Sequence, residues 1–197
     1  MPNTTTLKPF FERDFSLAPY ISADFKSFST KLRNFMKKVT EENPELELVS
    51  FNRGHFFCSG FFKSTETQVY IYFNVNWERG WHKKILYRTA KSDKDFTGGM
   101  NMYTTLEDFG KNVSTLAKRN YLIEGTVYSD IKLKKIGAEV ASLWGAECYD
   151  FRVKFDESTV YFFCIEHGEE FTTSKYFFEL NAWKNNNSLG FPREFLF

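Results

Sequence analysis

Three stretches of the chain repeat their apolar residues at the spacing of an amphipathic helix. The apolar positions of the first stretch are Phe25, Phe28, Leu32, Phe35, Met36 and Val39. Ser22 is suited to cap the start of this helix, and Pro44 excludes helix for the residue before it. The second helix is predicted to begin with a capping box at Thr104, and the third is predicted to run from a cap at Ser129 to Gly145.

Between and after these helices, apolar and polar residues alternate with the period of two that is typical of strands. A hairpin is predicted from 55–63 and 68–77, followed by a strand at 84–90. Along 68–77, one face is apolar and the other carries two tyrosines and two asparagines, so the second face is a candidate binding surface. The last three predicted strands are 148–155, 160–166 and 175–181.

This order of elements indicates an α+β fold in which antiparallel sheet packs against three helices. We expect a single α+β domain over residues 1–197. The alternative is two half-repeats, over 22–120 and 129–183, each a helix followed by a meander that ends near an Asn and a Trp. Layers of similar order also arise without duplication, so both interpretations stay open.

Composition adds an aromatic and an electrostatic feature to this picture. Aromatic residues form 19% of the chain, and most are expected in a strand-rich core, with the remainder available for an exposed recognition face. The net charge of +1 gives no global attraction for nucleic acid. Residues 1–120, however, carry 18 basic and 13 acidic side chains, against 8 and 12 in 121–197. This polarity suits a head-to-tail contact or a partner with one basic and one acidic edge, and chance variation of the surface is the alternative.

Basic residues and glycine are densest around the loop at 91–101. The candidate partner-binding residues there are Arg79, Trp81, Lys83, Lys84, Arg88, Lys91, Lys94 and Phe96. We expect the cations to be exposed and the aromatic side chains to anchor the contact. The successive N–H groups of Thr97, Gly98 and Gly99 form a candidate anion nest, although the segment is neither a P-loop nor a GxGxxG motif. An ordinary solvated loop is the alternative.

Motifs that carry enzyme or metal chemistry are weak. The candidate zinc ligands His55, Cys58, Cys164 and His167 form one His-x-x-Cys and one Cys-x-x-His pair. Residues three apart on a strand point to opposite faces, so we predict no metal and no other cofactor. The chain lacks GxSxG and HExxH, and we predict that it is not an enzyme. A metal-dependent nuclease and a Cys/His hydrolase stay open as alternatives.

The three cysteines are widely spaced and odd in number, which argues against a disulfide framework and favours a reducing compartment. The N-terminal residues do not have the pattern of a signal peptide, and no long apolar run is present. We therefore expect a cytoplasmic protein without membrane contact.

The segment ILYRTAKSDKDFTGGMN (85–101), which follows FFCSGFFK (56–63), resembles small accessory proteins carried by phages and mobile elements of low-GC bacteria. The resemblance implies the cytoplasm of a host cell, and a role in interfering with host defence or in handling phage nucleic acid. It brings no catalytic residue to this chain.

These observations predict a non-enzymatic binding protein that inhibits a host protein, or a protein–nucleic acid complex, by occluding its surface. The alternative is a protein that binds nucleic acid directly through basic and aromatic residues. The oligomeric state is not predicted.

Overall fold

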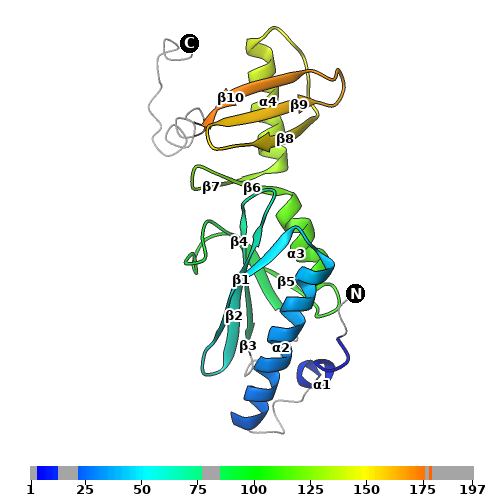
Figure 1. Ribbon diagram of the computed structural model, residues 1–197, viewed down its shortest axis with the longest axis vertical. Helices are drawn as coiled ribbons and strands as arrows, with labels where there is room; N and C mark the ends of the chain where they lie inside the picture. Colours follow the sequence, from blue (N-terminus) through cyan, green and yellow to red (C-terminus); the bar gives the residue numbers. More distant parts are fainter. Residues whose placement is uncertain (1–3, 13–21, 77–84, 176–177, 179–197) are drawn as a thin grey trace. The chain divides into compact units, whose positions relative to one another are not determined.

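The computed structural model describes residues 4–12, 22–76, 85–175 and 178. It divides into two compact units, residues 1–122 (unit 1) and 123–197 (unit 2). The predicted α+β class is confirmed, because each unit combines helix with antiparallel sheet (Figure 1). Each of the two halves named from the sequence lies inside one unit.

Unit 1 is built on a five-stranded antiparallel sheet in which neighbours in the sequence are neighbours in space. Its strands are β1 (Leu46–Arg53), β2 (Phe57–Ser64), β3 (Tyr70–Asn76), β4 (Ile85–Ala90) and β5 (Met102–Thr104). A bulge between Leu48 and Ser50 interrupts the register of β1 with β2. The described helices of this unit are α1 (Lys8–Phe11), α2 (Ser22–Glu42) and α3 (Phe109–Lys118).

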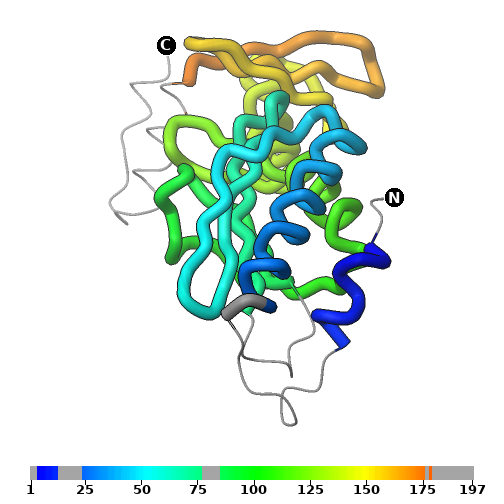
Figure 2. Tube along the Cα trace, turned by 60° about the horizontal axis from the view of Figure 1, so that its bottom comes forward, coloured from blue at the N-terminus to red at the C-terminus, as the bar shows by residue number. Residues whose placement is uncertain are grey.

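The core of unit 1 lies between one face of this sheet and the helices α2 and α3, which lie beside each other in Figure 2. Every apolar position predicted for the buried face of α2 is at most 4% exposed. The Phe109 ring, at the start of α3, packs against Phe35 of α2 (6.2 Å between centroids) and against Phe62 and Phe73 of the sheet (6.1 Å each). Aromatic residues therefore fill this core, as their abundance predicts.

The predicted start of α3 was wrong. Thr104 closes β5 instead of capping the helix, and its hydroxyl accepts a hydrogen bond from the Asn112 side chain (2.7 Å). The helix begins at Phe109, after a turn in which the Thr105 hydroxyl accepts from the Asp108 N–H (3.3 Å). The hydroxyl and the acid that meet here are thus Thr105 and Asp108, one residue after the pair that the capping box would use.

Unit 2 places one long helix against a three-stranded antiparallel sheet of order β10-β9-β8. A two-stranded hairpin, β6 (Asn120–Ile123) and β7 (Thr126–Ser129), leads into it. The other elements are α4 (Asp130–Leu143), β8 (Phe151–Phe155), β9 (Thr159–Cys164) and β10 (Glu170–Ser174). The Ser129 hydroxyl accepts from the Lys132 N–H (3.3 Å), which confirms the predicted cap, and Gly145 takes a positive φ of 75° beyond the helix.

Two predictions for unit 2 were wrong. The last described strand is β10. Of the strand predicted at 175–181, only Lys175 and Phe178 belong to the described residues, and both are helical. Cys148 and Cys164 form a disulfide, with 6.2 Å between their Cα atoms. The support that unpaired cysteines gave to a reducing compartment is therefore removed.

Candidate functional site

The loop at 91–101 connects β4 to β5 and lies on the side of the unit 1 sheet opposite α2 and α3 (Figure 1). We call that side the open face. The Asp95 carboxylate holds the loop together by accepting hydrogen bonds from the backbone N–H groups of Lys91 (3.0 Å), Thr97 (3.3 Å) and Gly98 (2.8 Å). Two N–H groups of the candidate anion nest are thus already occupied by an anion of the same loop.

The electrostatics of Asp95 reflect this arrangement. Burial by itself would raise the pKa of the Asp95 carboxyl. The three backbone donors and the nearby Arg88 guanidinium lower the pKa by more, so it lies below its ordinary value. Asp95 was not singled out from the sequence, although an Asp followed two and three residues later by Thr and Gly is a signal for such a turn.

Arg88 is buried, with only 2% of its surface exposed, which corrects the expectation that it supplies an exposed charge. Its guanidinium lies 4.7 Å from the centroid of the Tyr72 ring, its partner across β3 and β4. It also donates hydrogen bonds to the backbone carbonyls of Asp95 (3.0 Å) and Thr89 (3.2 Å). Arg88 therefore fastens the loop to the sheet, and almost none of its surface is exposed.

Two further contacts seat the loop on the open face. The Phe96 ring packs edge-on against Phe61 (5.2 Å) and Tyr72 (5.9 Å), which belong to the buried cluster of this face. Gly99 has a positive φ of 75°, and a Cβ atom there would lie 2.5 Å from the Thr89 carbonyl oxygen. Glycine is thus required by both conformation and space.

The braced loop displays large side chains to solvent. We define the loop surface by five exposed residues with large side chains, which are Lys91, Lys94, Phe96, Met100 and Tyr103. Phe96 is 52% exposed, Met100 78% and Tyr103 50%. Tyr103 belongs to β5 and lies opposite Leu86 of β4. Of the candidate residues named from the sequence, Lys91, Lys94 and Phe96 are brought together here, while Arg79, Trp81, Lys83 and Lys84 lie outside the described residues.

The tyrosine and asparagine face predicted for the second hairpin strand forms part of the open face. Tyr72 accepts a hydrogen bond on its hydroxyl from the Asn74 amide (3.1 Å), and the Lys63 ammonium lies 5.6 Å from the centre of the Tyr70 ring. These side chains are mostly engaged with one another and with the loop. Tyr72 is buried and Tyr70 and Asn74 are half-buried, whereas Asn76 at the end of β3 is exposed.

The candidate zinc ligands do not form a site. Cys164 is bonded to Cys148, so its thiolate is not available. Cys58 is fully buried, and burial raises the pKa of its thiol to about 12. His55 and His167 are exposed. Within the described residues, the one cluster of three metal-ligating types is Cys148, Cys164 and Glu166, and the disulfide occupies both of its sulfur atoms.

Among the described helices, none combines the length and the apolar character needed to cross a membrane. No protein-family model, curated protein or solved structure matches this chain.

Proposed function

We propose that this chain is a non-enzymatic binding protein that occludes the surface of a protein partner through the loop surface. The observation that carries the proposal is the exposure of Phe96, Met100 and Tyr103 on and beside a loop whose backbone is hydrogen-bonded to Asp95 and Arg88. Solvated loops do not need large apolar side chains, whereas interfaces are enriched in aromatic residues and methionine. A braced loop also loses little conformational entropy when it binds.

The charge of the loop surface indicates the character of the partner. The Asp95 carboxylate is turned inward to backbone donors, which leaves Asp93 as the exposed acid beside Lys91 and Lys94. The exposed charge is thus net positive around an apolar centre. An apolar patch with an acidic rim is its complement, and the resemblance to phage accessory proteins suggests a host protein as the bearer of that patch.

The test is affinity capture from bacterial host extract, followed by direct titration with the purified partner. Phe96→Ala combined with Met100→Ala is expected to weaken binding at least tenfold, because truncation of buried anchors typically costs about 1–2 kcal/mol or more each. Lys91→Ala combined with Lys94→Ala is expected to slow association and to reduce the salt dependence of binding.

Two matched controls separate the loop surface from general surface effects. Ile131→Ala removes an apolar side chain that is 71% exposed in unit 2, and Lys37→Ala with Lys38→Ala removes two exposed cations from α2. Both are expected to bind like the wild type. Equal binding by the loop variants and the controls would contradict the proposal, as would a captured ligand that is nucleic acid released steeply by salt.

A further inference from the structure

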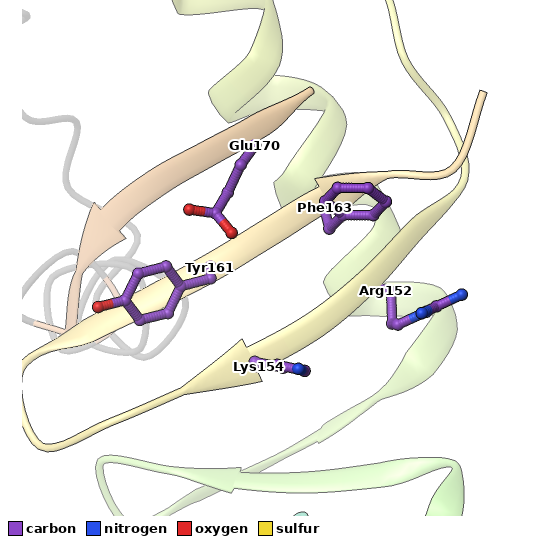
Figure 3. A pocket seen from close by; sticks show the side chains of 5 residues that line it. All are labelled: Arg152, Lys154, Tyr161, Phe163 and Glu170. Atoms are coloured by element: carbon purple, nitrogen blue, oxygen red, sulfur yellow. The ribbon is translucent and has the colours of Figure 1, made fainter. Parts of the chain in front are cut away.

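The outer face of the unit 2 sheet carries side chains in two rows across its three strands, and Figure 3 shows five of them. Taken from β8 to β10, the first row is Arg152, Phe163 and Glu170, and the second is Lys154, Tyr161 and Thr172. Within each row the three residues are register partners. Each row therefore combines a cation, an aromatic ring and a hydrogen-bonding group in the same order.

Five of these side chains line an open hollow of about 220 Å³, with Thr172 next to it in register. Clefts that enclose small molecules usually measure about 300–1,000 Å³. The lining residues are exposed or half-exposed, and Figure 3 shows them rising from one side of the sheet. This shape fits an extended chain that lies across the face better than a molecule enclosed within it.

The cations and one ring of this face are available and ordered. In the described part of the chain, neither Arg152 nor Lys154 forms an ion pair or lies over an aromatic ring. The Tyr161 hydroxyl donates to the Asp156 carboxylate (2.6 Å), which also accepts from the N–H groups of Ser158 and Thr159 (2.9 Å each). The Tyr161 ring is thus held in place before any ligand arrives.

The opposite face of the sheet explains why this side is presented outward. Helix α4 packs on the inner face, where a Cβ atom at Gly137 would lie 2.8 Å from both the Phe151 and the Phe162 rings. The inward residues Val153 and Phe162 are buried, whereas Phe163 is 39% exposed. The inner face is therefore committed to the core, and the outer face is left with two exposed cations beside two rings.

The spacing of the rows matches a polymer that repeats a flat ring and an anion. Residues two apart on a strand are separated by roughly 6.6–6.8 Å, so the two rings and the two cations repeat together at that interval. Single-stranded nucleic acid is bound in this manner elsewhere, by bases stacked on aromatic side chains and phosphates held by cations. The Glu170 carboxylate only accepts hydrogen bonds, so it selects a base edge that carries an amine.

We propose that the outer face of β8, β9 and β10 binds single-stranded nucleic acid, with one nucleotide on each row. Phe163 and Tyr161 stack the bases, Arg152 and Lys154 hold the phosphates, and Glu170 favours a base with an exocyclic amine. This site is separate from the loop surface of unit 1 and does not depend on the function proposed for it.

The experiment uses the full-length protein and fluorescently labelled eight-nucleotide homopolymers of cytidine and uridine, each as DNA and as RNA, with fluorescence anisotropy as the readout. Phe163→Ala and Tyr161→Ala are each expected to weaken binding about tenfold, the effect of losing one stacked base. Arg152→Ala with Lys154→Ala is expected to reduce the slope of log affinity against log salt by about 0.7 for each lost phosphate contact. The DNA and RNA arms decide which sugar is preferred.

Glu170→Gln gives a readout that a merely structural role would not move. The wild type is expected to prefer cytidine, because the cytosine amine donates to the carboxylate and the uracil oxygen does not. The amide of the variant both donates and accepts, so its preference for cytidine over uridine is expected to fall towards unity. An unchanged preference in a protein whose rings do contribute would overturn the assigned orientation of the bases.

Tyr149→Ala is the matched control, since it removes an aromatic side chain that is 67% exposed in unit 2 but stands outside the two rows. It is expected to bind like the wild type, and far-UV circular dichroism confirms that every variant is folded. Absence of oligonucleotide binding by the wild type, or equal binding by the Tyr149 and Phe163 variants, overturns the proposal. Oligonucleotide binding that is lost with Phe96→Ala and Met100→Ala, but kept in the Phe163 variant, assigns nucleic acid to the loop surface instead.

Discussion

At the scale of single residues, Asp95 and Arg88 turn a charged loop into a fixed surface. Asp95 gathers three backbone N–H groups from within the loop, and Arg88 joins the loop to the sheet below it. Neither side chain is placed to meet a partner. Their effect on binding is therefore indirect and acts through the presentation of Phe96 and Met100.

Asp95→Ala tests this role. The variant leaves three N–H groups without their acceptor and is expected to destabilise the loop by about 1–2 kcal/mol at neutral pH. Because the folded pKa of Asp95 lies below its ordinary value, the contribution is present above about pH 4 and is lost as the pH falls through the folded pKa. Amide hydrogen exchange of Lys91 and Gly98, measured across pH, checks both the size and this direction.

Asp93→Ala is the control for that experiment, since it removes an exposed carboxylate from the same loop. It is expected to change stability by less than about 0.5 kcal/mol. Equal protection of the Gly98 amide in the wild type and the Asp95 variant would show that the carboxylate does not hold the loop.

The residue scale is also where sequence reasoning missed most. Arg88 lies on the open face of the sheet, which solvent would reach if the loop did not cover it. It is buried because Asp95 and Phe96 fold back over it. Cys148 and Cys164 are separated by 16 positions, and only the fold brings their sulfur atoms together. Both contacts join residues that are separated along the chain and meet only in the folded protein. The local pattern of apolar residues does not encode them.

At the scale of elements, periodicity was a good guide wherever an element buries one face. The apolar face of α2, the cap of α4 and the hairpin of β2 and β3 were all predicted correctly. The errors fall on short strands. β5 has three residues and β10 five, too few for alternation to stand out from a turn. β10 (Glu170–Ser174) lies between the strands that were predicted at 160–166 and 175–181.

Two glycines in helices provide a test of packing at this scale. Gly137→Ala in α4 would place its Cβ 2.8 Å from two buried phenylalanine rings, so overpacking of about 1–3 kcal/mol is expected to outweigh the better helix propensity of alanine. Gly110→Ala in α3 would meet Val39 at 3.7 Å, an ordinary contact, and is expected to be neutral or stabilising by up to about 1 kcal/mol.

Urea unfolding of both variants measures the difference. The pair is informative because the substitution is the same and only the space around the Cβ atom differs. A Gly137 variant at least as stable as the wild type would mean that α4 lies further from β8 and β9 than the structure places it.

At the scale of the whole molecule, the division of charge follows the division into units. Residues 121 and 122 are uncharged, so the excess of 18 basic over 13 acidic side chains belongs to unit 1, and that of 12 acidic over 8 basic side chains to unit 2. The exposed charge of the loop surface is net positive, as is the net charge of unit 1. The outer face of unit 2 has two cations within an acidic unit, so local arrangement and not net charge has to account for any affinity for phosphate.

Both cysteines of the disulfide belong to unit 2, so its effect on stability is expected to be confined to that unit. Closing a loop of this length is typically worth about 3 kcal/mol, so reduction is expected to lower the stability of unit 2 by that amount. Hydrogen exchange should then accelerate in α4, β8 and β9 and stay unchanged in α2, β2 and β3.

Thiol titration checks the pairing independently. Native protein is expected to show no reactive thiol, since burial raises the pKa of Cys58 to about 12; unfolded protein should show one, and unfolded and reduced protein three. Three thiols before reduction would contradict the pairing and restore the sequence-based expectation of a reducing compartment.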